Sequence, residues 1–432
     1  TEADAKQGLQ ALVDALMKGQ GEATGMAIAN QLLRHYQLLD RDMRVVFFKY
    51  LGEVLKPDPD EVKAAVAAYE AEPSDANLLR LQEAVDSPRQ EFFRRLNMAP
   101  GATAQIVQMR KELLDFIREE PSLQPIDRDL FHLLQSWFNR GFLVLRRIDW
   151  QTPASILEKI IEYEAVHEID GWDDLRRRLN PADRRCFGFF HPSLIDEPLI
   201  FVEVALTDHV AEDIHSLLAP AAATAGGDGP LPTTAVFYSI SNCQGGLRGV
   251  SFGNFLIKQV VDELKKEFDS LKTFVTLSPV PRFAGWLEAV KKGEVSNGLE
   301  LGEPEHAVLA RLDEPLWWEQ REDDEELRDL VMALAAHYFL EAKGPTGRPI
   351  DPVARFHLGN GARLEKINWL ADTSIRGLKQ SHGLMVNYLY DPRENETNHA
   401  AFANLGQIAA SRAVRNLERA RGRRGSKTQP TP

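Results

Sequence analysis

The fold is decided by residues 233–281, which read TTAVFYSISNCQGGLRGVSFGNFLIKQVVDELKKEFDSLKTFVTLSPVP. Residues 233–241 are rich in Val, Ile, Phe, Tyr and Thr, which predicts a β-strand. A glycine-rich turn follows, and the helix predicted after it has an apolar face made of Leu256, Val260, Val261, Leu264 and Phe268. A second strand is predicted over residues 273–277. The order strand, turn, helix, strand indicates an α/β domain in which the helix lies on a sheet.

The sequence around this segment has the same alternation of strands and helices. Strands are predicted over residues 142–148, 185–190 and 199–206, and a helix from Pro153 to about Tyr163. Residues 219–232 contain several Gly and Pro residues and are predicted to form a surface loop. Helices are expected again over residues 325–343 and 364–370.

The N-terminal part differs, because nearly every segment up to about residue 140 has helical periodicity. Asp40, Ser74 and the Ser87-Pro88 pair are typical helix starts, and Asp127 precedes an apolar stripe. We therefore expect two domains, a bundle of seven or eight helices over residues 1–140 and an α/β domain over residues 141–432. Bundles with broad apolar faces often form subunit interfaces, so a homo-oligomer, a dimer or a tetramer, is expected through the bundle.

The composition excludes several classes of protein. The chain has 432 residues, 44% of them hydrophobic and 27% charged, as a globular protein requires. Its 51 basic and 64 acidic residues give a net charge of −13, so a nucleic acid partner is not expected. Two cysteines are too few for a disulfide framework or a four-thiolate metal site. No apolar run is long enough for a membrane span, and a cytoplasmic location is expected.

The glycine-rich turn has two interpretations. Gly246, Arg248, Gly249 and Gly253 lie just before the predicted helix, where free amides and the helix dipole attract an anion. Acetyltransferase-like domains bind the pyrophosphate of coenzyme A at such a turn, and the pattern of Arg248, Gly249, Val250, Ser251, Phe252, Gly253 and Asn254 resembles theirs, with Ser251 in place of a patterned glycine. A coenzyme A site is therefore predicted over residues 248–254.

The alternative interpretation is a nucleophile elbow, because residues 249–253 also satisfy G-x-S-x-G. Ser251 would be the nucleophile of an α/β-hydrolase, with Asp372 and His382 as its partners. An elbow requires a strand that runs straight into the motif. The predicted strand ends near Ser241, and seven loop residues follow, so a phosphate-binding turn is favoured.

Six further segments are specific rather than generic. They are RRCFGFFHPS at 184–193, VFYSIS at 236–241, FLIK at 255–258, LSPVP at 277–281, HLGNGA at 357–362 and INW at 367–369. Their order and spacing over about 250 residues resemble the malonyl-CoA decarboxylase family. The resemblance implies a helical bundle followed by an acetyltransferase-like (GNAT) catalytic domain. It implies catalytic roles for Ser278 and His357, supporting roles for Ser239, Tyr390 and Asn360, and coenzyme A binding at Arg248 to Asn254. Some members carry a glutamate where Ser251 stands here.

The residues themselves are compatible with these roles. Ser278 ends a predicted strand, where Pro279 and Pro281 are expected to stop further pairing. His357 lies beside Phe356 and before a Gly-Asn-Gly turn, which favours an aromatic, partly dry pocket. Tyr390 alone would be predicted as a half-buried strand residue.

The predicted reaction is removal of the carboxylate of malonyl-CoA, giving acetyl-CoA and carbon dioxide. The thioester can hold the charge that is left as an enolate, so no metal or organic cofactor is expected. Ser278 is expected to bind the malonyl carboxylate, and His357 to deliver a proton to carbon. The alternatives are an acyl-CoA-dependent acetyltransferase and a thioesterase of the hydrolase type with Ser251 as nucleophile.

Overall fold

The computed structural model describes residues 2–18, 21–219, 231–250, 256–295, 299–320, 323–345 and 347–425. The chain forms two compact units. The first consists of Thr1–Val144, Phe189–Leu199 and Asn242–Phe252, and the second of Leu145–Gly188, Ile200–Ser241 and Gly253–Pro432. Each unit is described by itself.

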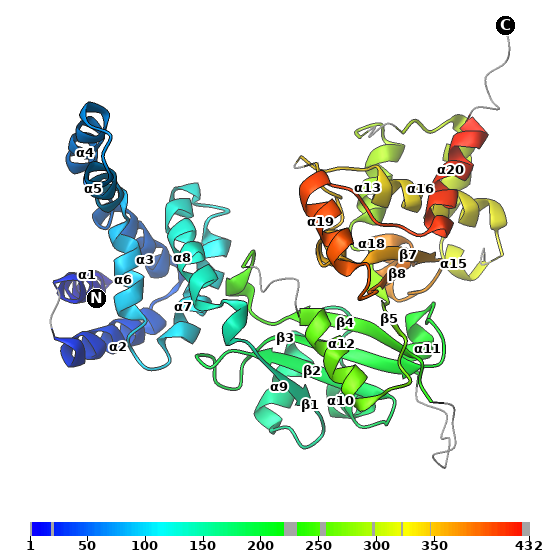
Figure 1. Ribbon diagram of the computed structural model, residues 1–432, viewed down its shortest axis with the longest axis horizontal. Helices are drawn as coiled ribbons and strands as arrows, with labels where there is room; N and C mark the ends of the chain where they lie inside the picture. The colour runs from blue at the N-terminus through cyan, green and yellow to red at the C-terminus, as the bar shows by residue number, and fades with distance from the viewer. Residues whose placement is uncertain are drawn as a thin grey trace, which may run out of the picture. The chain divides into compact units, whose positions relative to one another are not determined.

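The first unit is mainly helical, as the sequence predicts (Figure 1, blue to cyan). Its helices are α1 (Glu2–Met17), α2 (Glu22–Leu38), α3 (Arg41–Val54), α4 (Pro59–Ala71), α5 (Asp75–Val85), α6 (Pro88–Leu96), α7 (Ala102–Phe116) and α8 (Gln124–Trp137). Asp40 accepts a hydrogen bond from the Met43 amide at 2.9 Å, and Ser74 accepts one from the Asn77 amide at 3.3 Å. These two predicted N-caps are confirmed. Helix α8 begins three residues before Asp127, which lies in its first turn.

The core of this unit is aromatic and aliphatic. Phe47, Phe48, Phe92 and Phe93 are buried together with the leucines of the other helices. Helix α5 is an exception, because none of its residues is buried. Its side chains Leu78, Leu79 and Val85 are all exposed.

The second unit contains most of a mixed sheet in the order β1-β2-β3-β4-β5-β8-β6, with β7 also paired to β8. The strands are β1 (Val144–Ile148), β2 (Arg184–Phe190), β3 (Pro198–Thr207), β4 (Thr234–Asn242), β5 (Thr273–Thr276), β6 (Ser278–Pro279), β7 (Arg363–Asn368) and β8 (Met385–Leu389). The predicted strands before residue 277 are thus confirmed, with small shifts at their ends.

Helices also accompany the sheet, as predicted. They are α9 (Ala154–Tyr163), α10 (Gly171–Leu179), α11 (Ile214–Leu218), α12 (Leu256–Glu267), α13 (Phe283–Lys291), α14 (Glu303–Leu309), α15 (Trp317–Gln320), α16 (Glu325–Leu340), α17 (Pro352–Gly359), α18 (Ile375–Ser381), α19 (Asn395–Leu405) and α20 (Arg412–Gly425). Helix α12 buries Leu256, Val260, Val261 and Leu264, the face that the sequence indicates.

The helix predicted over residues 364–370 is wrong, because this segment forms strand β7. It pairs antiparallel with β8 from Arg363 to Asn368, with an irregularity between Leu364 and Lys366. Helices α16, α17 and α20 contact β7. This tertiary packing outweighs the weak local preference of a short apolar run, which cannot separate strand from helix.

Candidate active site

Ser278 stands where two strands succeed one another along β8. Val275 of β5 pairs with Leu389, and Ser278 and Pro279 of β6 then pair with Val386 and Met385. The prediction that Pro279 stops the pairing is therefore wrong on the β8 side. Strand β4 pairs with β3 and β5, and its register with β5 ends at Phe237 and Thr276, so the missing amide of Pro279 interrupts no ladder with β4.

His357 lies in the last turn of α17, and both ends of this short helix are held. Asp351 accepts hydrogen bonds from the amides of Val353 and Ala354 at 2.9 and 2.8 Å. At the other end, the side-chain amide of Asn360 donates to the Phe356 carbonyl at 2.7 Å. Asn360 is thus placed to fix the helix that carries His357, and its own amide also donates to the His357 carbonyl.

Gly361 completes the turn after α17. Its φ is +82°, a conformation that favours glycine. A Cβ atom at this position would lie 2.0 Å from the Asn395 carbonyl oxygen. The Gly-Asn-Gly segment noted in the sequence is therefore a requirement of the turn that brings the chain from α17 into β7.

Ser278, His357 and Tyr390 form a continuous hydrogen-bonded series. Ser278 Oγ lies 3.1 Å from His357 Nε2, and His357 Nδ1 lies 2.8 Å from the Tyr390 hydroxyl. Ser278 Oγ also donates to Thr276 Oγ1 at 2.8 Å. The structure thus brings three of the predicted site residues into direct contact, although 79 positions separate Ser278 from His357.

The bond to Thr276 determines the direction of the series. A serine hydroxyl has one proton, and Ser278 gives it to Thr276. Ser278 must then accept from Nε2–H of His357, so Nδ1 of the neutral ring accepts from Tyr390 O–H. In this tautomer Tyr390 donates to Nδ1 of His357, and Nε2–H of His357 is directed to Ser278.

The imidazole is surrounded by aromatic rings, as predicted. The Tyr388 ring stacks on His357 with centroids 4.5 Å apart, and Phe356 meets its edge at 5.1 Å. Burial lowers the pKa of His357 to about 3, because a charged ring would lose its hydration. Burial likewise raises the pKa of Tyr390 well above its usual value. Burial therefore favours the uncharged form of the His357 ring near neutral pH.

Thr276 and Tyr388 belong to this site and were not predicted. Tyr388 donates its backbone amide to Thr276 Oγ1 at 3.1 Å. The signal for both was strand alternation, since Thr276 lies two residues before Ser278 and Tyr388 two residues before Tyr390. Side chains two apart on a strand share a face.

Ser239 is held by a different partner. Its hydroxyl donates to the Glu164 carboxylate at 2.7 Å and lies 3.2 Å from that of Ser241. The β4–β5 register ends at the pair Phe237 and Thr276, and Ser239 and Ser278 each lie two residues beyond that pair. Ser239 and Ser278 therefore lie on the same face of the sheet.

The predicted coenzyme A turn is described only as far as Val250; Ser251, Phe252, Gly253 and Asn254 lie outside the described residues. Arg248 is exposed, and Gly249 has a φ of +84°. This turn belongs to the first unit, where the buried guanidinium of Arg110 donates to the carbonyls of Gly246 at 2.7 Å and Arg248 at 3.1 Å.

Gly246 has a packing role. A Cβ atom there would lie 1.8 Å from the carbonyl oxygen of Val107 in α7. No side chain larger than hydrogen fits this close approach. The turn is thus fixed on a helix of the bundle by a guanidinium and by the absence of a side chain.

The hydrolase alternative lacks support in the described part of the chain. Nε2 of His382 is buried with no hydrogen-bond partner among the described residues, and burial lowers the pKa of His382 to about 4. Asp372 accepts from the amide of Ser374 at 3.0 Å. Its carboxylate thus serves the turn before α18.

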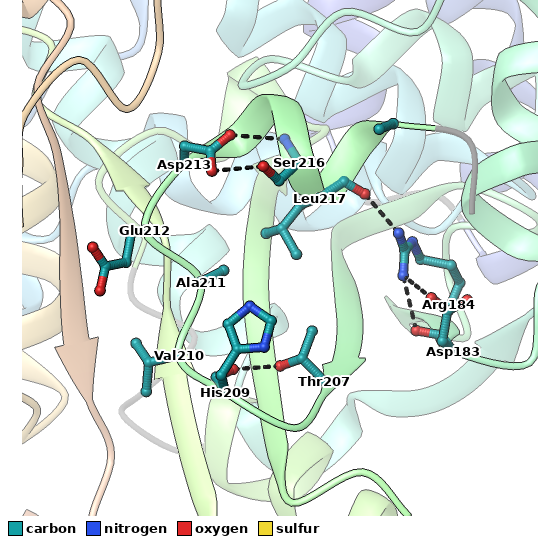
Figure 2. Close-up of a pocket in the computed structure, with 11 residues that line it drawn as sticks. Asp183, Arg184, Thr207, His209, Val210, Ala211, Glu212, Asp213, Ser216 and Leu217 are labelled. Carbon is teal, nitrogen blue, oxygen red and sulfur yellow. Dashed lines mark hydrogen bonds and ion pairs between the residues drawn. The ribbon is translucent and has the colours of Figure 1, made fainter. Parts of the chain in front are cut away.

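A pocket of about 640 Å³ lies elsewhere in the second unit, between β3 and α11 (Figure 2). Its polar groups are used within the fold, because Asp213 accepts from the amide and hydroxyl of Ser216, and Arg184 donates to the Leu217 carbonyl. None of the predicted site residues lines it.

Within the described ranges, no group of three or more His, Cys, Asp or Glu is placed to hold a metal ion. None of the helices in those ranges has the length and hydropathy needed to cross a bilayer.

A helical bundle, a mixed sheet and a buried serine–histidine pair define the class of this protein as a two-part α plus α/β enzyme. The family model of the malonyl-CoA decarboxylase C-terminal domain matches residues 141–428. The family model of the malonyl-CoA decarboxylase N-terminal domain matches residues 55–138. The chain belongs to the malonyl-CoA decarboxylase family. The predicted family and the predicted carboxy-lyase class are thereby confirmed.

Individual relatives agree with this assignment. A malonyl-CoA decarboxylase structure from Rhodopseudomonas palustris is 52% identical, with a TM-score of 0.90 over 95% of this chain and 99% of that one. One from Agrobacterium vitis is 49% identical, with a TM-score of 0.89 over the same shares. The mitochondrial malonyl-CoA decarboxylase of Rattus norvegicus is 37% identical over 78% of this chain and 72% of its own length.

Proposed function

We propose that this chain converts malonyl-CoA and a proton into acetyl-CoA and carbon dioxide, with Ser278 and His357 acting on the malonyl group. The hydrogen bond between these two residues in a buried, aromatic site carries the proposal. Breaking the bond to the carboxylate leaves an enolate whose charge rests on the thioester oxygen. The reaction therefore needs donors, exclusion of water and a proton source, and no cofactor.

The neutral state of His357 fits the arrival of an anion. The malonyl carboxylate brings a negative charge into a site that has excluded water, and an opposite charge nearby raises the pKa of an imidazole. His357 then takes up the proton that the reaction consumes and passes it to the new carbanion. Rotation of the Ser278 hydroxyl away from Thr276 lets it donate to the carboxylate.

The turn from Arg248 to Asn254 is proposed to bind the coenzyme A pyrophosphate. The exposure of Arg248 and the positive φ of Gly249 support this role. We keep a cytoplasmic location as a prediction, while the rat relative is named mitochondrial.

The function is tested by incubating the protein with malonyl-CoA while following carbon dioxide, acetyl-CoA and free thiol. We expect carbon dioxide and acetyl-CoA in equal amounts, without any acceptor. An acetyltransferase would instead consume acetyl-CoA when given an amine, and a thioesterase would release free thiol.

Replacing His357 by Ala tests the site. We expect about a hundredfold to ten-thousandfold lower kcat, the usual cost of removing a proton-transfer group. His209→Ala is the matched control, because that imidazole is 72% exposed. Near-normal activity of His357→Ala would rule out the assignment.

The helical segment 1–140 is proposed to form a homo-oligomer, a dimer or a tetramer. Helix α5 supports this, because it buries none of its side chains within the chain while Leu79 is 57% exposed. Light scattering should give a mass two or four times the chain mass of 48.6 kDa. Leu79→Lys should lower it, and a monomeric wild-type protein would contradict the proposal.

A further inference from the structure

Glu164 is a buried acid that the proposed chemistry does not use, although it contacts a residue of the site. It directly follows helix α9 and is 9% exposed. Its Oε1 accepts from the amides of Val166 and His167 at 2.7 and 2.8 Å. Its Oε2 accepts from the hydroxyls of Ser239 and Ser241 at 2.7 and 3.2 Å. Each carboxylate oxygen thus has two donors, which fix its orientation.

The bond to Glu164 determines what Ser239 can offer to a ligand. A hydroxyl has a single proton, and Ser239 directs it to a carboxylate, the stronger kind of acceptor. Only lone pairs of Ser239 remain for other groups. Ser241 accepts from the Ala165 amide at 3.2 Å, so the same segment holds both serines. Ser239 therefore meets a ligand as a hydrogen-bond acceptor.

Ser239 is close to the reacting group by strand register. Continuing the β4–β5 register by two residues beyond its last pair, Phe237 and Thr276, places Ser239 level with Ser278 on the same face of the sheet. The paired register covers Thr234–Phe237 and Thr273–Thr276, and the Leu277 amide then donates to the Phe237 carbonyl. Paired strands lie about 4.8 Å apart, and the two strands are no longer paired at this level, so Ser239 flanks the proposed thioester site at one strand spacing or more.

The chemistry of malonyl-CoA limits which group an acceptor can bind. The malonyl carboxylate, the thioester oxygen and the enolate formed from it are all acceptors, and they would be repelled by a lone pair of Ser239. The hydrogen-bond donor of malonyl-CoA that lies nearest to its thioester is an amide N–H of the coenzyme A arm. Two methylene groups separate this N–H from the thioester sulfur, a reach comparable to one strand spacing.

We propose that Glu164 is a positioning residue, which accepts the hydrogen bond of the Ser239 hydroxyl. The Ser239 oxygen is then left as an acceptor for the first amide N–H of the coenzyme A arm. The inference rests on the proposed function of the Ser278–His357 site. The amide N–H does not change during decarboxylation, so this contact binds substrate and transition state equally. Its loss raises KM and leaves kcat almost unchanged.

Glu164→Gln tests the polarity at constant size. The glutamine oxygen can still accept from the amides of Val166 and His167, so its NH₂ group faces Ser239. The hydroxyl must then accept from Gln and turn its proton outward. We expect about a tenfold higher KM for malonyl-CoA, the scale of one lost hydrogen bond, with kcat changed by less than about threefold.

The double variant Glu164→Gln/Ser239→Ala separates positioning from a merely structural effect. Ser239→Ala alone should raise KM to a similar extent. If Glu164 acts through Ser239, adding Glu164→Gln to Ser239→Ala should raise KM no further. Multiplying effects, a lower kcat with unchanged KM, or unchanged kinetics of Glu164→Gln would each overturn the proposal.

A substrate analogue provides a second test, which does not depend on whether the Glu164→Gln variant folds. In this analogue an ester oxygen replaces the first amide N–H of the arm. Wild-type protein should show a KM about tenfold higher than for malonyl-CoA, and Ser239→Ala should show no such difference. An equal preference in both proteins would overturn the proposal.

Glu203→Gln is the control for replacing a buried carboxyl group by an amide of the same size. Glu203 is fully buried on β3 and bonds to Arg178 at 3.3 Å rather than to a serine. Its KM should match that of the wild type. Failure of the proposed function has a different signature, because wild-type protein would then release no carbon dioxide from malonyl-CoA.

Discussion

Nε2 of His357 lies 3.1 Å from Oγ of Ser278, and this distance joins the last turn of α17 to the two-residue strand β6. Neither element is long enough to be stable alone. The contact is therefore set by the packing of both elements around β8. Kinetic measurements on single substitutions of Ser278 or of His357 can separate the contributions of the two residues to catalysis.

Ser278→Ala removes the hydroxyl that faces the imidazole. We expect kcat to fall about a hundredfold to a thousandfold, the usual effect of removing one donor to developing charge, together with about 1–3 kcal/mol lower stability, because the buried Nε2–H of His357 loses its acceptor. Ser216→Ala is the control, because the Ser216 hydroxyl bonds only to Asp213 in the described structure. A kcat within threefold of wild type for Ser278→Ala would contradict the assigned role.

Tyr390→Phe removes the hydroxyl that donates to Nδ1 of His357. The ring remains, but Nδ1 loses its partner, so we expect kcat to fall about tenfold to a hundredfold. Tyr388→Phe is the matched comparison: the Tyr388 hydroxyl is buried with no partner among the described residues. Its loss should leave kcat and stability at wild-type levels or slightly raise stability. Equal losses in both variants would argue against a role of this hydrogen bond in catalysis.

His382→Asn should reduce the sensitivity of the fold to acid. Burial lowers the folded-state pKa of His382 to about 4, whereas the ordinary value is 6.5. On acidification the unfolded chain binds the proton first, so this contribution to stability is complete above pH 6.5 and is lost as the pH falls toward 4.

Urea unfolding at pH 7 and pH 5 measures the difference. Asparagine tolerates the φ of +51° at this position. The drop in unfolding free energy between the two pH values should be smaller in the variant by about 1–2 kcal/mol. An identical drop in both proteins would show that His382 is not protonated on unfolding.

Arg110→Met tests the support of the proposed coenzyme A turn. Arg110 is 3% exposed and also pairs with Asp127 at 2.7 Å. Its removal leaves that acid and two carbonyls unpaired, so we expect about 3–5 kcal/mol lower stability and a higher KM for malonyl-CoA. Arg118→Met, a mostly exposed residue 3.9 Å from Asp115, should change neither. An unchanged KM in a destabilised Arg110 variant would show that the turn does not contribute to the binding of malonyl-CoA.

Much of this architecture follows from the sequence. Helix starts at Asp40 and Ser74 could be predicted because a cap is a local interaction over three residues. The strand-turn-helix-strand order of residues 233–277 was likewise visible, since each element has its own periodicity. Strand β7 was not, because its partner β8 lies 17 or more residues further on.

The candidate site shows the same limit. Ser278, His357 and Tyr390 were identified together only through the family resemblance, and their distances became known with the structure. Glu164 carries no sequence signal of its role. Its partners Ser239 and Ser241 lie 75 and 77 positions away. The aromatic pocket of His357 could be predicted from Phe356, but its depth of burial, and with it the lowered pKa of His357, depends on Tyr388, which lies 31 positions away.

The close approach of Gly246 to Val107 has a practical consequence for dividing the gene. A fragment that began at residue 141 would retain the turn but lose the helix carbonyl against which it rests and the guanidinium that grips it. From the proposed role of this turn in coenzyme A binding, we expect such a fragment to keep the serine and histidine and to have a higher KM for malonyl-CoA than the full chain. Complementation with a separately expressed helical piece would then be the natural way to restore it.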